Sequence, residues 1–139
     1  MAGTESMSVR APRKLPHVRG VTYTDTSGVE SRPVSSTRNL FDDSDAPATG
    51  ERFETLAEAR GVQIERIVSS ASPEPARYVQ EQDEWVLLVR GEATLDVDGR
   101  TVELRAGDHV FLPARTPHTV LRTTAGALWV AVHIHPEKT

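Results

Sequence analysis

The sequence predicts an all-β protein in which antiparallel strands curl into a barrel. Short apolar segments with alternating side chains follow one another through the second half of the 139-residue chain. Glycine, aspartate and proline separate these segments, which is typical of tight turns between strands. No internal repeat or heptad pattern is visible. A series of short strands with such turns indicates an antiparallel sheet that closes on itself.

One hairpin joins residues 94–97 to residues 101–104, because Asp98-Gly99 readily supplies the positive φ of a tight primed turn. A second turn at Gly107-Asp108 leads into a strand that ends at Pro113, since proline has no N–H for the ladder. The other expected strands lie around Val86 and Leu88 and over residues 62–68, 76–80, 109–112 and 128–134.

One short helix is expected before these strands, over about residues 51–60. Phe53, Leu56 and Ala57 recur at helical spacing with good helix formers between them, and Gly61 is placed to end the helix. We expect Phe53 to cover the bottom of the barrel rather than to contact a ligand.

The chain divides by composition into an N-terminal arm, residues 1–36, and a barrel domain, residues 37–139. The arm is rich in Ser, Thr, Gly, Pro and Arg, and its scattered apolar residues cannot build a core. Pro12 and Pro16 break any amphipathic helix, so a solvated, disordered tail is expected. Residues 21–24 are the exception, because their β-branched and aromatic side chains suit an edge strand within the subunit or across a dimer.

Composition and charge exclude several classes of function. A formal net charge of −4 gives no general attraction to polyanions, so no nucleic-acid partner is expected. The chain has no cysteine, which excludes disulfides, thiolate catalysis and cysteine metal sites and fits a cytoplasmic location. No stretch has the length and apolarity of a membrane span, and the N-terminus lacks the apolar run of a secretion signal.

Two groups of residues resemble the conserved motifs of the cupin superfamily. In the second motif, Gly107, Pro113 and His118 match the glycine, proline and histidine of the family. Arg115 stands where cupins have a further glycine, and Arg122 stands where they have asparagine.

The first motif is matched only in its second half. Glu84 and Gly91 occupy the positions of its glutamate and its final glycine. Tyr78 and Gln80 stand where cupins have two histidines, and Ser72 replaces the opening glycine. The half of the motif that binds metal in the family is therefore degraded in this chain.

The resemblance covers about residues 39–135 and implies a jelly-roll β-barrel. Small cupins are commonly dimers, so it also implies a homodimer. Cupins usually hold Fe, Mn, Ni or Zn with histidines and a carboxylate, and transfer by position gives Gln80, Glu84 and His118 as the metal ligands here. The loss of imidazoles lowers the affinity and shifts the preference toward oxygen-loving ions, so occupancy would be weak.

The strand pattern itself brings polar side chains together. Tyr78 and Gln80 are two apart in an extended segment and share a face, and Glu84 opens the neighbouring strand. Burying these groups with His118 is costly unless they meet a metal, a ligand or one another. The structural alternatives are a strand-end carboxylate in the charged turn 81–84, and a histidine bonded to a nearby threonine hydroxyl.

The last strand leaves the direction of His133 open. Alternation places Trp129, Ala131, His133 and His135 on one face and Val130, Val132 and Ile134 on the other. The second set is more apolar, which favours it as the core face and turns the histidines outward. The opposite arrangement would place His133 in a polar cavity.

Arg122 is a candidate for substrate binding, because its planar guanidinium suits a carboxylate or phosphate in the cavity. Simple solvation at the surface explains it equally well.

Three functions fit these residues. The leading hypothesis is a metal-dependent enzyme of dioxygenase, isomerase or decarboxylase type, with Tyr78 or His133 moving protons near the ion. The second is a barrel that binds or senses a small metabolite without chemistry. The third is a metal-free catalyst in which Glu84 and His118 are the proton-transferring pair. All three take a small molecule as partner.

Overall fold

The computed structural model describes residues 36–137. The chain divides into two units, residues 1–38 and 39–139, and the strands of the described region belong to the second. The expected arm over residues 1–36, with its edge strand at residues 21–24, lies outside the described residues except for Ser36. Within the described region, no helix is long and apolar enough to cross a membrane.

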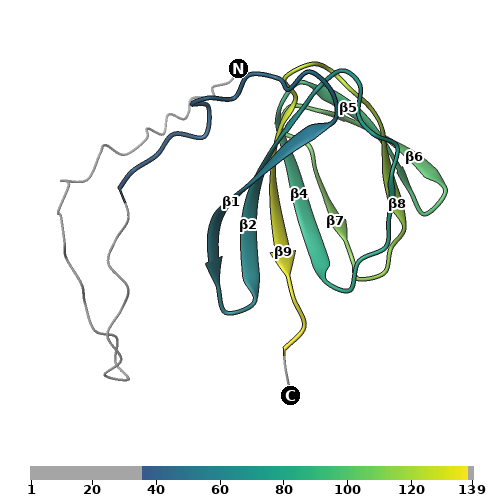
Figure 1. The fold of residues 1–139 in the computed structure, drawn as a ribbon. Helices are drawn as coiled ribbons and strands as arrows, with labels where there is room; N and C mark the ends of the chain where they lie inside the picture. The colour runs from purple at the N-terminus through teal and green to yellow at the C-terminus, as the bar shows by residue number, and fades with distance from the viewer. Residues whose placement is uncertain (1–35, 138–139) are drawn as a thin grey trace, which may run out of the picture. The chain divides into compact units, whose positions relative to one another are not determined.

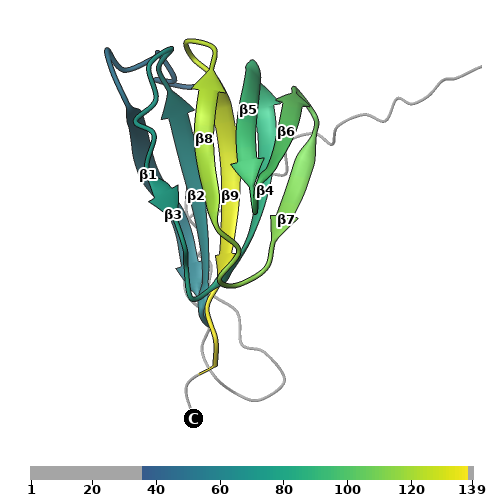
Figure 2. The same cartoon turned by 90° about the vertical axis from the view of Figure 1, so that its right-hand side faces the viewer.

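The second unit is a sandwich of two antiparallel sheets, which confirms the expected all-β jelly roll (Figure 1). The second sheet lies over the face of the first (Figure 2). The first sheet has the order β1 (Glu51–Ala59), β2 (Val62–Ser69), β9 (Leu128–Ile134), β4 (Asp83–Arg90) and β7 (His109–Leu112). The second has the order β3 (Arg77–Tyr78), β8 (His118–Thr123), β5 (Glu92–Val97) and β6 (Arg100–Arg105).

The expected helix over residues 51–60 is wrong, because this segment is strand β1. It pairs with β2 along its whole length, from Glu51 opposite Ser69 to Ala59 opposite Val62. Gly61, with φ 79°, closes the hairpin rather than capping a helix. A β-bulge between Thr55 and Ala57 interrupts the alternation of side chains. The bulge explains why the sequence pattern resembled a helical one.

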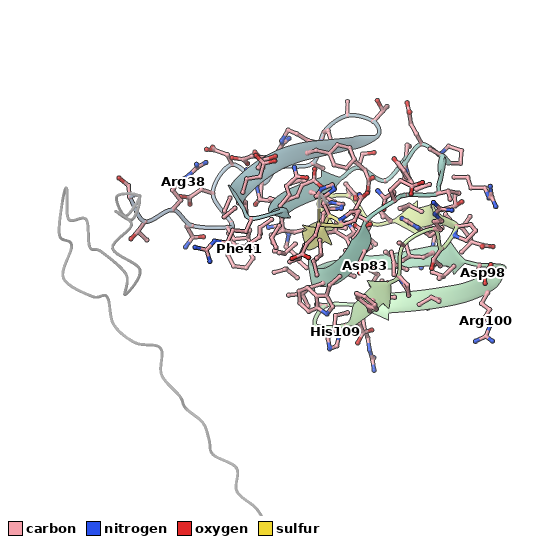
Figure 3. All side chains as sticks on the ribbon, turned by 90° about the horizontal axis from the view of Figure 1, so that it is seen from below. Arg38, Phe41, Asp83, Asp98, Arg100 and His109 are labelled. Carbon is pink, nitrogen blue, oxygen red and sulfur yellow. The ribbon has the colours of Figure 1, made fainter. Side chains whose placement is uncertain are left out.

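The predicted hairpin between β5 and β6 is confirmed. Asp98 and Gly99 have φ angles of 52° and 86°, as the primed turn requires. Gly99 N donates to Asp96 Oδ1 at 3.0 Å, which holds the turn. Asp98 and Arg100 lie at the outer end of this hairpin (Figure 3).

The expectation that Val130, Val132 and Ile134 form the core face of β9 is wrong. Trp129, Ala131 and His133 point between the sheets, with 3%, 0% and 7% exposure, whereas Ile134 is exposed. The apolar outer face of this sheet is itself partly covered. Arg66, which pairs with Val130, donates to the carbonyl oxygens of two residues in the segment before β1, Leu40 and Asp42. Apolarity on the outer face therefore reflects this cover, and not the main core.

The main core lies between the sheets and becomes polar where β4 begins and β9 ends. Glu84 pairs with His133 on the first sheet, and His118 pairs with Tyr78 on the second. The buried apolar cluster consists of Ile67, Val86, Leu88, Ala93, Leu95, Leu104, Leu112, Ala127, Trp129 and Ala131.

Candidate functional site

A cavity of about 260 Å³ lies between the two sheets, next to the apolar core. It receives side chains from both sheets, so residues far apart in sequence line one cavity. Its polar lining residues are Glu51, Gln63, Glu65, Tyr78, Gln80, Glu84, His118 and His133. Its apolar lining residues are Phe53, Ile67, Val86, Leu95, Leu112, Val120 and Trp129. Phe53 thus lies at the cavity itself, which corrects the expectation that it would only cover the bottom of the barrel.

Glu84 is the least satisfied polar group of the cavity. Its side chain is 9% exposed, and its Oε1 atom is buried without a hydrogen-bond partner in the described structure. Burial raises the pKa of Glu84, the nearby His133 and His118 oppose this rise, and Glu65 and Glu51 add to it. A buried carboxyl group with a raised pKa in a cavity holds its proton more tightly than a free carboxyl group and is suited to accept and release one.

His118 faces Glu84 across the sandwich, with its Nε2 atom 3.7 Å from Glu84 Oε1. On its other side, Nδ1 lies 3.0 Å from the carbonyl oxygen of Thr116. A carbonyl oxygen only accepts hydrogen bonds, so Nδ1 is the donor and carries a proton. In the neutral ring Nε2 is then the acceptor, directed toward Glu84. The expected contact with a threonine hydroxyl is replaced by one with the threonine backbone.

The separation of 3.7 Å exceeds the range of a direct hydrogen bond. Glu84 and His118 therefore form a pair with space for a ligand atom at their shared edge. Because both side chains are only 9% exposed, a proton moving between them and a ligand is shielded from bulk water.

His133 lines the cavity but has both ring nitrogens occupied. Gln82 Nε2 lies 3.2 Å from Nδ1, and Glu65 Oε1 lies 2.9 Å from Nε2. An amide nitrogen donates, so Nδ1 accepts and Nε2 carries the proton shared with Glu65. The hydrogen bond with Glu65 raises the pKa of His133, and burial opposes this rise. Glu65 thus fixes the ring orientation and favours its charged form.

Glu51 enters the cavity from β1 and is held by a chain of hydrogen bonds. Trp129 Nε1 donates to Ser69 Oγ at 3.0 Å, and Ser69 Oγ donates to Glu51 Oε2 at 2.6 Å. Burial raises the pKa of Glu51, the bond from Ser69 lowers it, and the nearby Glu65 raises it. These two hydrogen bonds connect Trp129, in the apolar part of the lining, to the carboxylate of Glu51.

Tyr78 and Gln80 also line the cavity, on the side of the second sheet. The Tyr78 ring stacks on the His118 ring, with centroids 5.6 Å apart and planes inclined by 26°. Burial raises the pKa of Tyr78, and the carboxylates of Glu51, Glu74, Glu84 and Glu65 raise it further. Tyr78 therefore keeps its phenol proton and is a hydrogen-bond donor at neutral pH.

Arg122 does not reach the cavity, which corrects the expectation that it binds substrate there. Val120 pairs with Leu95 and Arg122 with Thr94, so the register between β8 and β5 shifts by one residue. The side chains that point inward are therefore Val120 and the buried Thr123, and the side chain of Arg122 points outward. It lines a separate charged recess with Glu92, Glu103, Leu104, Arg105 and Asp108.

The residues present fit a divalent metal poorly. Within residues 36–137, no three His, Cys, Asp or Glu side chains are grouped so that they could hold an ion. The nitrogens of His133 are both bonded, which leaves one imidazole of His118, one carboxylate of Glu84 and the amide of Gln80. Such a set offers a transition ion little affinity.

Sequence reasoning missed Glu51 and Glu65, which contribute two of the carboxylates in the cavity. Glu51 had been placed in the expected helix. Glu65 lies with Gln63 and Ile67 on the less apolar face of β2, and that face turned out to point inward. The signal was present in a repeated pattern: β2 and β9 both carry polar residues at one end of their less apolar face.

Comparison with known proteins identifies the domain. The family model of the cupin domain matches residues 65–136. A protein of Ralstonia eutropha JMP134, provisionally assigned as a mannose-6-phosphate isomerase, is 38% identical, and its structure superposes with a TM-score of 0.66. The match covers 73% of this chain and 100% of that protein. No curated protein matches the chain at a significant level.

More distant structures share the fold alone. A Streptococcus pyogenes protein of unknown function is 20% identical, with a TM-score of 0.66 and coverage of 76% of this chain and 91% of its own. The cupin domain of an XRE-family transcriptional regulator from Enterobacter cloacae is 14% identical, with a TM-score of 0.55. That match covers 64% of this chain and 100% of the regulator domain.

Proposed function

This chain belongs to the cupin family, and we propose that it catalyses proton transfer on a small metabolite bound in the cavity. Glu84 and His118 are the acid–base pair of this proposal. One observation carries it: the buried Oε1 atom of Glu84 has no hydrogen-bond partner and lies 3.7 Å from Nε2 of His118. The pair is thus arranged to exchange a proton with a third group.

The reaction class is proton transfer next to a carbonyl, as in aldose–ketose isomerisation. The carboxylate of Glu84 takes a proton from the carbon beside the carbonyl, and protonated Nε2 of His118 gives a proton to the carbonyl oxygen. An enediol results. Glu84 then returns the proton to the former carbonyl carbon, and Nε2 of His118 takes the proton from the hydroxyl group on the carbon that was first deprotonated. The new carbonyl forms at that second carbon, and both side chains are restored.

Three features of the site support this role. The raised pKa of Glu84 brings its proton affinity toward neutrality, where a general base works best. The hydrogen bond from Nδ1 to Thr116 fixes the His118 ring so that Nε2 faces the cavity. Tyr78, stacked on that ring, is placed to donate a hydrogen bond to a substrate oxygen. The 38% identical Ralstonia eutropha protein, a provisionally assigned isomerase, adds support for this reaction class.

The experiment is solvent deuterium exchange, followed by NMR on a panel of aldoses and ketoses. We expect exchange at the carbon next to the carbonyl of at least one sugar. Glu84→Gln and His118→Gln should lower the rate by about a hundredfold or more. Glu103→Gln is the matched control, because Glu103 lies in the outer charged recess.

If Glu84→Gln retains the full exchange rate on a sugar that the wild-type protein turns over, the proposed pair is wrong. Exchange that is lost on treatment with a chelator and restored by a divalent ion would instead favour the metal-dependent hypothesis. A ligand that stabilises the protein with no exchange in any variant would favour the binding or sensing hypothesis.

Family membership also leads us to propose a homodimer that works in the cytoplasm. The absence of cysteine in the sequence fits a reducing compartment. Sedimentation velocity at several protein concentrations tests the dimer, which a constant monomer mass would contradict.

A further inference from the structure

The cavity wall carries several carboxylates, and its positive charge can come only from histidine. Glu51, Glu65 and Glu84 reach the cavity from three strands of the first sheet, β1, β2 and β4. Among the residues that the structure describes, the lining includes no lysine and no arginine. The neighbouring recess, which shares Glu51 and Tyr78 with the cavity, adds the carboxylate of Glu74.

We propose that the cavity takes a ligand that donates hydrogen bonds and carries no anionic group, and that it rejects phosphorylated and carboxylated molecules. Hydroxyl and ammonium groups share the required chemistry. This inference rests on the proposed function in placing the substrate in the cavity, and it narrows the class of that substrate.

Glu84 requires a hydrogen-bond donor from the ligand. Its Oε1 atom is buried and has no hydrogen-bond donor in the described structure. A hydroxyl or ammonium group supplies the missing donor. A phosphate or carboxylate oxygen is an acceptor, so facing Glu84 with one would leave two acceptors unsatisfied and two like charges close together.

A bound anion requires donors that carry positive charge. Proteins hold phosphate and carboxylate groups with guanidinium forks, ammonium groups or helix N-termini. The described region has no helix, and no arginine lines the cavity. Arg66 lies on the outer face of β2, bonded to Leu40, Asp42 and Glu54. Arg115 is 72% exposed and pairs with Glu81.

The carboxylates also act on a neighbouring titratable group. Burial is the largest cause of the raised pKa of Tyr78, and the negative charges of Glu51, Glu74, Glu84 and Glu65 each raise it further. The same field that disfavours a phenolate at this position disfavours an anionic group on a ligand. Positive charge on His133 and negative charge on its hydrogen-bonded partner Glu65 balance each other, which leaves Glu51 and Glu84 as the acidic groups of the lining without such a partner.

The acidic lining therefore differs from the cationic lining expected of an enzyme that binds a sugar phosphate. The apolar part, which includes Phe53 and Trp129, offers contact to the carbon skeleton of a ligand. The acidic part of the lining favours a ligand with hydrogen-bond donors at the ligand's periphery. A neutral polyol and an organic amine both meet these conditions, and they can be distinguished experimentally.

The test uses the full chain and three probes with the same sugar ring: mannose, mannosamine and mannose 6-phosphate. Calorimetric titration at neutral pH and low ionic strength gives the three affinities. We expect mannose or mannosamine to bind more tightly than mannose 6-phosphate by about tenfold or more. A preference for mannosamine over mannose assigns an amine ligand, and equal affinity for the two assigns a neutral polyol.

Equal affinities for all three probes, including a lack of binding by all three, would overturn the inference, as would tighter binding of the phosphate. Glu51→Gln and Glu65→Gln should each reduce the discrimination against the phosphate, whereas Glu103→Gln should leave it unchanged. A variant that does not fold is replaced by the other of the pair, and folding is checked by circular dichroism.

The outcome separates this inference from the proposed function. Discrimination against the phosphate without deuterium exchange on any sugar refutes the acid–base proposal alone. Exchange on mannose 6-phosphate at least as fast as on mannose, with no discrimination in binding, refutes the charge selection alone.

Discussion

Glu84 and His118 meet across the interior of the sandwich, with Oε1 and Nε2 3.7 Å apart and each side chain 9% exposed. They come from different sheets, since Glu84 belongs to β4 and His118 begins β8. This contact indicates a functional role because it leaves the Oε1 atom of Glu84 without a hydrogen-bond donor. A carboxylate oxygen that is buried without a donor destabilises the fold, and such groups are retained where a ligand or a proton completes them.

Glu84→Gln should stabilise the protein. The substitution removes a buried acid whose charged form is disfavoured by desolvation, and its amide nitrogen can donate to Nε2 of His118. We expect the free energy of unfolding to rise by about 1 kcal/mol at neutral pH. Urea denaturation of both proteins measures this. Glu103→Gln, at an exposed position, should change it little, and a large loss of stability in Glu84→Gln would contradict the account.

Stability should fall as the pH rises through neutrality. The pKa of Glu84 is raised above its ordinary value of 4.5, so the folded protein holds a proton that the unfolded chain releases, and stability is lost as pH rises through the folded pKa. Glu51 acts in the same direction. The raised pKa of His133 gives stability below its ordinary value of 6.5 that is likewise lost at higher pH.

Thermal melts from about pH 5 to about pH 9 measure this dependence, and Glu84→Gln should reduce its slope. An unchanged slope in the variant would show that Glu84 titrates in the folded protein as it does in the unfolded chain.

Glu65→Gln should lower the pKa of His133, because the 2.9 Å hydrogen bond to the carboxylate is the main cause of its rise. NMR titration of the imidazole C–H signals gives this value directly. His109 is an internal reference, since its ring lies against Trp85 on another face of β4, at 5.5 Å between centroids. A pKa of His133 that is the same in both proteins would mean that the pair does not form.

Gly91→Ala should be strongly destabilising. Gly91 has φ +94°, and an added Cβ would lie 2.7 Å from Thr124 Oγ1 and 2.9 Å from Ala127 Cα. We expect a loss of about 3 kcal/mol or more from strain and overlap together. Gly107→Ala is the matched control, because Gly107 has φ +98° but nothing within 4 Å of the added Cβ. Its loss of about 1 kcal/mol would report the backbone strain alone.

Metal content should be far below stoichiometric in protein purified without a polyhistidine tag. The available donors are one imidazole, one carboxylate and one amide, since both nitrogens of His133 are bonded. Elemental analysis of the wild type and of His118→Ala measures this. Stoichiometric metal in the wild type that is lost in His118→Ala would restore the expected site at Gln80, Glu84 and His118.

Much of the strand arrangement could be predicted because turns act locally. Asp98-Gly99 fixes the hairpin between β5 and β6 through its own φ angles, and Pro113 follows the end of β7 whatever surrounds it. The segment of β1 was misassigned, because its bulge broke the period of two that identifies a strand. The extended conformation of this segment depends on its pairing with β2.

Local sequence did not show in the same way to which face of its sheet each side chain points. On β9 the sequence favoured the apolar Val130 and Val132 as the core face, and on β8 it left Arg122 equally suited to the cavity and to the surface. Cover of the outer face reversed the first expectation, and a register shift decided the second. A shift of one residue turns every later side chain to the other side of a strand.

The sequence by itself determined the cupin family, the turns and the candidate pair Glu84 and His118, because these depend on residue identity and spacing along the chain. Tertiary structure decided that Glu51, Glu65 and His133 join them, and that Arg122 does not. Strands from two sheets meet there, and which face each presents depends on bulges, register and cover that local sequence does not encode.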